Sequence, residues 1–136
     1  MQSAKLQLKG RGEMLSGKKQ IYIVDDDESV RRALKLLLVT YDFQVETFNS
    51  AEKFFSAVPN SVPGCLILDI HMPGLEGWEA QQRLFKSGSK RPVIIISADK
   101  NGGLKEQAFR TGAIGFLQKP LDNQELVDLI NQAFTN

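Results

Sequence analysis

The sequence predicts an α/β protein with one five-stranded parallel sheet of the doubly wound type and five helices on its two faces. Short apolar runs rich in β-branched residues alternate along the chain with segments whose apolar residues recur at helical spacing. Each strand follows the previous one after roughly 23 residues, which suits a βα unit with a right-handed crossover. The chain has 136 residues, too few for an eight-stranded βα barrel, which needs about 250.

In the first part of the chain, two strands alternate with two helices. Residues 21–24 are a continuous apolar run, typical of a strand buried on both faces of a parallel sheet. Residues 28–40 carry apolar side chains at helical spacing and predict a helix. A weaker strand is predicted at 45–48, and Ser50 is a good N-cap for a helix that Pro59 stops.

The rest of the chain repeats this alternation three times. The predicted strands are the apolar runs at 65–68, 93–96 and 114–117. The predicted helices lie at 76–87, at 103–111 and after Pro120, with Asp122 as the N-cap of the last one.

The composition excludes several classes of protein. Apolar residues make up 42% of the chain and charged residues 24%, as expected for a folded domain rather than a disordered or membrane-embedded chain. The single cysteine, Cys65, excludes an intramolecular disulfide and a cysteine-based zinc site. The single histidine, His71, excludes a metal site built from several histidines.

Residues 1–19 differ from the remainder in charge. Five basic residues against one acidic residue give this segment a net charge of +4, so the rest of the chain carries −3 of the total of +1. The segment has no apolar run long enough for a signal peptide or a membrane helix. We expect a basic, disordered leader at 1–19 and one folded domain over 20–136; a basic docking arm is the alternative for the leader. The expected compartment is the cytoplasm.

Polar residues gather where the predicted strands end, which in an open α/β sheet is the edge that carries the functional site. In chain order, they are Asp25, Asp26, Asp69, Ser97 and Lys119. Three carboxylates cannot all stay ionised in a shallow cleft without a cation, and an all-oxygen site favours Mg²⁺. A carboxylate beside Mg²⁺ and an ammonium group is placed to attack a phosphoryl group. Taken singly, an aspartate after a strand is usually a helix cap, and a Lys-Pro pair is usually a turn. The prediction of a phosphoryl-transfer site therefore rests on the occurrence of all these residues at successive strand ends.

These residues lie in stretches that resemble the receiver domain of two-component response regulators. The matching stretches, spread over residues 20–134, are IVDDDESVRRAL, LILDIHMPGLEGWE, VIIISA and GAIGFLQKP. The segment GAIGFLQKPLDNQEL resembles the FixJ type, whose full-length members carry a DNA-binding domain. The resemblance implies the strand order 2-1-3-4-5.

The resemblance also implies that Asp69 is the phospho-acceptor and Mg²⁺ the cofactor. Beside Asp69, the implied ligands are Asp26 directly, Asp25 largely through water, and the backbone carbonyl of His71. Because Asp27 extends the acidic run, the pair could be displaced by one residue. The point at which the apolar strand ends favours Asp25 and Asp26, with Asp27 at the start of the helix.

In receivers, a lysine and a hydroxyl group complete the site, and an aromatic residue acts as a switch. The resemblance assigns these roles to Lys119, Ser97 and Phe116, and it implies a cis Lys119–Pro120 peptide bond. We expect Phe116 on the exposed side of its strand, turning inward when Ser97 moves toward a phosphoryl group. This movement would remodel the face formed by the fourth helix, the fifth strand and the fifth helix.

The implied function is that of a signalling domain rather than a conventional enzyme. It accepts a phosphoryl group from the phosphohistidine of a sensor histidine kinase or a phosphotransfer protein, and it catalyses its own phosphorylation and dephosphorylation. The expected output of this signal is a change in transcription. We also expect a phosphorylation-dependent homodimer. Contact with DNA is expected only through an effector domain not present in this chain. No membrane partner is expected.

Three other functions are less compatible with these residues. A flavodoxin that binds FMN needs a Ser-, Thr- or Gly-rich loop after the first strand, and the acidic run at 25–28 would repel the phosphate. A phosphatase of the haloacid dehalogenase type needs an aspartate where this chain has His71. A degenerate receiver that serves only as a binding module is disfavoured by the intact Asp69, Ser97 and Lys119.

Overall fold

The computed structural model describes residues 18–70, 77–100 and 102–135, and its centre is a parallel sheet with the strand order β2-β1-β3-β4-β5. The strands are β1 (Gln20–Val24), β2 (Gln44–Phe48), β3 (Cys65–Asp69), β4 (Val93–Ser97) and β5 (Gly115–Gln118). The helices are α1 (Glu28–Thr40), α2 (Ala51–Ala57), α3 (Gly77–Ser87), α4 (Gly103–Arg110) and α5 (Asn123–Thr135). The predicted fold class and strand order are confirmed.

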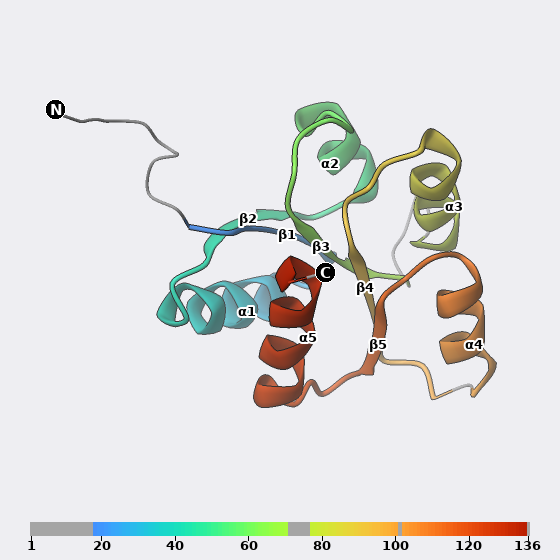
Figure 1. The fold of residues 1–136 in the computed structure, drawn as a ribbon. Helices are drawn as coiled ribbons and strands as arrows, with labels where there is room; N and C mark the ends of the chain where they lie inside the picture. The colour runs from blue at the N-terminus through green and yellow to red at the C-terminus, as the bar shows by residue number, and fades with distance from the viewer. Residues whose placement is uncertain (1–17, 71–76, 101, 136) are drawn as a thin grey trace, which may run out of the picture.

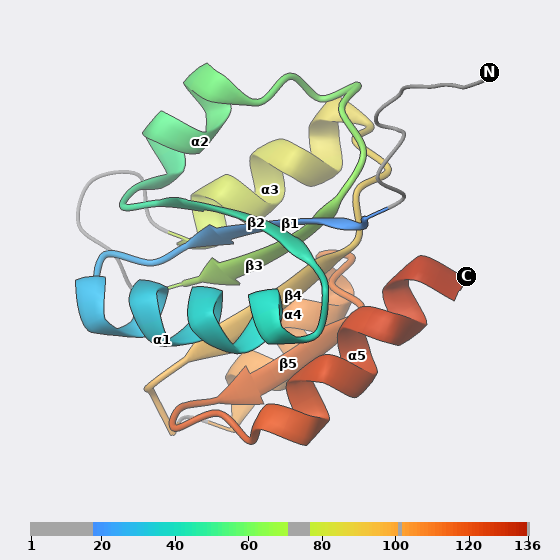
Figure 2. The ribbon, with the colours of Figure 1, turned by 90° about the vertical axis from the view of Figure 1, so that its left-hand side faces the viewer.

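Helices cover both faces of the sheet. Helices α1 and α5 lie on one face, and α2, α3 and α4 lie on the other (Figures 1 and 2). Each face has its own apolar core, one around Phe54, Leu84 and Ala108 and the other around Leu38 and Ile130. Strands β3 and β4 are buried at every residue, which is why their sequences are continuous apolar runs rather than alternating ones.

The element boundaries differ from the predicted ones by about one residue. Strands β3 and β4 end at Asp69 and Ser97, one residue past their apolar runs and at the polar residues expected to mark their ends. Strand β5 begins one residue late because Ile114 is an exposed apolar residue before the strand, whereas Gly115 is buried and pairs with Ile94. The apolar character of Ile114 therefore does not mark a strand position.

Side-chain caps fix the starts of three helices at the predicted residues. Ser50 Oγ accepts a hydrogen bond from the Lys53 amide at 3.2 Å, at the start of α2. A carboxylate oxygen of Asp122 accepts from the Glu125 amide at 2.9 Å, at the start of α5. Asp27 caps α1 in the same way. The Lys119–Pro120 peptide bond is cis, as predicted.

The predicted leader lies outside the described residues except for its last two lysines. The ammonium of Lys18 pairs with a carboxylate oxygen of Asp42 at 3.4 Å, and that of Lys19 lies 5.5 Å from the ring centre of Phe134. Within the described ranges, no helix has the length and apolar character needed to cross a membrane.

The single cysteine is part of the core. Cys65 begins β3, in the middle of the sheet, and is fully buried. Burial raises the pKa of its thiol to about 12, because the charged thiolate is disfavoured away from water. Cys65 is therefore a protonated packing residue at neutral pH.

Gly64, which precedes β3, occupies a place that no other residue can fill without strain. Its φ is +146°, and a Cβ atom there would lie 2.7 Å from Tyr22 Cε2 and 3.0 Å from the Gln20 carbonyl oxygen. We expect Gly64→Ala to lower the free energy of unfolding by about 3 kcal/mol, from backbone strain and overpacking together. The matched control is Gly88→Ala, where φ is +74° but nothing lies within 4 Å; it should cost only about 1 kcal/mol. Equal losses in urea denaturation would contradict the close contact.

Candidate functional site

The strands run in one direction, so their carboxyl ends meet at one edge of the sheet (Figure 2). Asp69 is in register with Ile96, and Ser97 is the next residue along that neighbouring strand. The Lys119 amide donates to the Ser97 carbonyl at 2.8 Å, which fixes the backbone of Lys119 just past the end of β5. The order of the strands therefore brings together residues that are far apart in the sequence.

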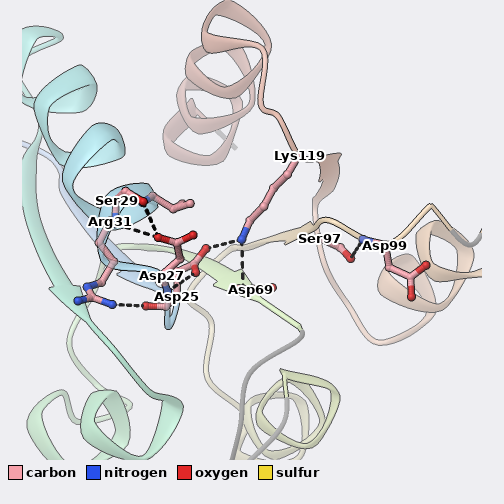
Figure 3. A network of polar contacts seen from close by, with 9 residues as sticks. Asp25, Asp27, Ser29, Arg31, Asp69, Ser97, Asp99 and Lys119 are labelled. Carbon is pink, nitrogen blue, oxygen red and sulfur yellow. Dashed lines mark hydrogen bonds and ion pairs between the residues drawn. The ribbon is translucent and has the colours of Figure 1, made fainter.

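The ammonium group of Lys119 lies between two buried carboxylates (Figure 3). Its Nζ is 2.8 Å from Asp25 Oδ2 and 3.3 Å from Asp69 Oδ2. Burial alone would lower the pKa of Lys119, but the contacts with Asp25 and Asp69 outweigh it and the pKa is raised. Lys119 is therefore charged at neutral pH, and it orients both carboxylates.

Asp25 is held through its backbone as well as its side chain. Its Oδ1 accepts a hydrogen bond from the Asp27 amide at 2.9 Å, and its amide donates to the Phe48 carbonyl at 3.2 Å. Its carbonyl accepts from Arg31 Nη1 at 2.8 Å. Its buried Oδ2 is paired with the Lys119 ammonium.

The residues at this edge fit a hard divalent cation. Asp25, Asp26 and Asp69 each offer a carboxylate oxygen, and these oxygens lie within 4.8 Å of one another. One ammonium group does not balance three carboxylates, and the carboxylate of Asp26 is exposed and open to a further cation. A small set of oxygen ligands with space for waters is the preference of Mg²⁺. His71, whose carbonyl is an expected ligand, lies outside the described residues.

Asp27 stands apart from this cluster. Its carboxylate accepts from the Ser29 hydroxyl at 2.6 Å and from the amides of Ser29 and Val30. The hydrogen bonds with Ser29 hold the pKa of Asp27 below its ordinary value. Asp27 therefore serves as the cap of α1, in the role that the predicted register gave it.

The two expected switch residues, Ser97 and Phe116, lie on the neighbouring strands β4 and β5. Ser97 is buried, and its hydroxyl oxygen accepts a hydrogen bond from the Asp99 amide at 3.0 Å. In Figure 3 this hydroxyl faces Asp99 and is separated from the Lys119 ammonium. Phe116 is half-buried rather than exposed, because it packs against the core that contains Leu104 and Ala108 of α4.

The structure adds Arg31, which the sequence reasoning missed. Its side chain reaches from the first turns of α1 to the carbonyl of Asp25, the residue after β1. In the sequence it is one of two adjacent arginines on a helix, and nothing in that pattern distinguishes Arg31 from Arg32.

Comparison with known proteins agrees with this geometry. Residues 21–131 match the family model described as the response regulator receiver domain. The chain is 41% identical over 113 residues to the transcriptional regulatory protein TdiR of Thauera aromatica, covering 83% of this chain and 50% of TdiR. It is 34% identical over 119 residues to the transcriptional regulatory protein FixJ of Bradyrhizobium diazoefficiens, covering 88% and 58%. The chain thus spans about half the length of these curated relatives.

Solved structures show the same relationship. The response regulator StyR superposes with a TM-score of 0.81 at 39% identity, over 88% of this chain and 60% of StyR. The structure named FixJ-N superposes with a TM-score of 0.80 at 29% identity, over 88% of this chain and 95% of FixJ-N. From the matched family model, the identity to these relatives and the shared strand order, the chain belongs to the response regulator receiver domains, the phosphoryl-accepting domains of two-component signalling.

Proposed function

We propose that Asp69 is the phospho-acceptor of this receiver and that its donor is the phosphohistidine of a sensor kinase or a phosphotransfer protein. The observation that carries this proposal is the Lys119 ammonium, which contacts Asp69 and Asp25 at one edge of the sheet. It holds the Asp69 carboxylate in place and supplies positive charge where the oxygens of an incoming phosphoryl group would lie.

The transfer exchanges one bond to phosphorus for another. A carboxylate oxygen of Asp69 attacks the phosphorus atom, the new P–O bond forms, and the P–N bond to the donor imidazole breaks. The leaving nitrogen keeps the electron pair of the broken bond. Attack by water on the same phosphorus later releases inorganic phosphate and restores the carboxylate, so the domain also ends its own signal.

The cofactor in this proposal is Mg²⁺. Asp26 and Asp69 would hold it directly, with Asp25 acting through water and the His71 carbonyl as a further ligand. When bound, Mg²⁺ neutralises charge on the phosphoryl oxygens during transfer. Asp26 suits direct contact because its carboxylate is exposed, whereas that of Asp25 is committed to Lys119 and the Asp27 amide.

We expect Asp69→Asn to abolish phosphorylation. Incubated with Mg²⁺ and a small phosphodonor, the wild-type chain should gain the mass of one phosphoryl group, and this gain should be lost in base. Asp69→Asn should gain nothing, whereas Asp99→Asn, which removes another carboxylate beside the same edge, should still be modified. Uptake of phosphate by Asp69→Asn in intact-mass measurements would refute the assignment.

We expect Asp26→Ala to weaken Mg²⁺ binding by roughly tenfold or more, because it removes a direct ligand. Asp27→Ala should change the Mg²⁺ affinity little, because the Asp27 carboxylate caps α1, and Asp25→Ala should fall between the two. The fluorescence of Trp78, the single tryptophan, provides the titration signal. Equal losses for Asp26→Ala and Asp27→Ala would show that the acidic pair is displaced by one residue.

A groove beside the site suits the protein that delivers the phosphoryl group. It lies between α1 and the start of α5, has a volume of about 460 Å³, and is mainly apolar. It is lined by Val30, Ala33, Leu34, Lys119, Pro120, Leu121 and Asn123. Because Lys119 lines the groove and also contacts Asp69, an apolar side chain seated there would hold the donor next to the acceptor. We propose that the phosphodonor protein docks in this groove.

We expect Ala33→Glu to slow phosphotransfer from a phosphorylated donor protein at least tenfold, because it places a charge in an apolar contact. Leu36→Glu is the matched control, since Leu36 is exposed on the same helix but outside the groove. Uptake from a small phosphodonor should be unchanged in both variants. If Ala33→Glu accepts phosphate from the protein at the wild-type rate, the donor docks elsewhere.

The response to phosphorylation is proposed to begin at Ser97. A phosphoryl group on Asp69 adds strong acceptor oxygens, which would draw the Ser97 hydroxyl away from the Asp99 amide. The space released behind β4 would let Phe116 turn further into the core. Helix α4 is suited to move with it, because its N-cap, Gly102, makes no side-chain cap hydrogen bond.

We expect beryllofluoride, a mimic of the phosphoryl group, to shift NMR signals between Gly102 and Phe116 as well as signals around Asp69. In Ser97→Ala the shifts around Asp69 should persist, while those of α4 should shrink, because the hydroxyl that couples the two regions is gone. Shifts confined to the loops near Asp69 in the wild-type chain would leave the phosphorylation chemistry intact but remove the switch.

The surface that this switch would alter carries apolar side chains among charged ones. Phe109, Ile114 and Phe116 line a pocket between α4, β5 and α5, and the first two are exposed. We propose that this face forms a phosphorylation-dependent homodimer.

We further propose that residues 20–136 form the receiver and residues 1–19 a leader. Since TdiR and FixJ are transcriptional regulatory proteins, we propose that the receiver acts in the cytoplasm and signals to transcription through an effector domain.

A further inference from the structure

Arg31 makes a contact that its neighbour on the helix does not. Its side chain folds back from α1, and Nη1 donates a hydrogen bond to the Asp25 carbonyl at 2.8 Å (Figure 3). The Arg31 amide also donates to the Asp27 carbonyl, at 3.1 Å. The adjacent Arg32 is exposed, and its guanidinium lies 3.6 Å from a carboxylate oxygen of Glu28.

These contacts fix the short segment 25–27 at both of its ends. Asp25 is tied to Arg31 through its carbonyl and to the Asp27 amide through Oδ1. Asp27 is tied to the first turn of α1 by its carboxylate. Between them, Asp26 presents an exposed carboxylate to the cluster that it forms with Asp25 and Asp69. The backbone that carries the exposed ligand is therefore held on both sides of it.

Holding this segment has an electrostatic cost, because one ammonium group faces three carboxylates and Asp26 is repelled by Asp25 and Asp69 when no divalent cation is bound. A free segment would relax by moving Asp26 away from Asp25 and Asp69. It would then have to be reordered each time a cation bound, and that reordering would weaken binding. A hydrogen bond from a charged, planar guanidinium to a backbone carbonyl is well suited to resist this relaxation.

We propose that Arg31 is a positioning residue that keeps the acidic segment 25–27 preformed for a divalent cation, and so sets the affinity of the site for Mg²⁺. This inference rests on the Mg²⁺-dependent function proposed above. Arg31 acts through the Asp25 backbone, so its effect reaches the cation without direct contact. Because Arg31 also carries a positive charge, the experiment separates the effect of its position from that of its charge.

The experiment compares Arg31→Ala, Arg31→Lys and Arg32→Ala. Mg²⁺ is titrated into each chain without a phosphodonor, and affinities are taken from the amide NMR shifts of residues 24–30. We expect Arg31→Ala to bind Mg²⁺ about tenfold more weakly, in the range known for residues that orient metal ligands. Arg32→Ala removes the same charge one residue away and should bind like the wild-type chain. Arg31→Lys should be intermediate, since it keeps the charge but loses the planar fork.

A second readout follows the segment when no cation is present. Hydrogen exchange of the Asp27 amide, which is bonded to Asp25 Oδ1, should become several-fold faster in Arg31→Ala and should be unchanged in Arg32→Ala. Unchanged exchange in Arg31→Ala, equal losses of Mg²⁺ affinity in Arg31→Ala and Arg32→Ala, or full affinity in Arg31→Lys would each overturn the proposal. Neither measurement involves phosphorylation, so a failure of the Asp69 assignment would appear only in the intact-mass experiment described above. If Arg31→Ala does not fold, Arg31→Lys carries both measurements.

Discussion

The site depends on the ammonium group of Lys119, which lies between the carboxylates of Asp25 and Asp69. Without this positive charge, the two carboxylates would repel each other. Burying Asp25 and Asp69 without a partner would cost several kcal/mol each, because a charged carboxylate loses its hydration. The Lys119 ammonium offsets this cost for both residues at once. The contact joins the end of the first strand to the residue after the last, so the site exists only when the whole sheet has formed.

The two members of the acidic pair divide the work because they differ in exposure. Asp25 is completely buried and its oxygens are engaged with Lys119 and the Asp27 amide, whereas Asp26 faces solvent. The Asp25 carboxylate thus pairs with the Lys119 ammonium, and the Asp26 carboxylate is available to a metal ion. The difference arises just past the end of β1, where Asp25 directly follows the buried strand and Asp26 lies in the bend before α1.

The parts of the fold and site that could be predicted are those fixed by strand order and burial. Continuous apolar runs gave the buried strands, and their shared direction placed Asp25, Asp69 and Lys119 at one edge. The exposure of Phe116 was not predictable in the same way, because it depends on how α4 packs over β5. The contact of Arg31 with Asp25 depends on which way one long side chain turns, and the sequence holds no periodic signal for that.

The proposed phosphorylation site at the edge of the sheet is separated from the thiol of Cys65 in the middle of the sheet. Cys65 is the only cysteine in the chain, it is fully buried, and burial raises its pKa to about 12. Oxidants and alkylating agents react with thiolates that they can reach, and Cys65 is neither ionised at neutral pH nor accessible. The domain can therefore change its phosphorylation state under oxidative stress without its cysteine acting as a redox sensor.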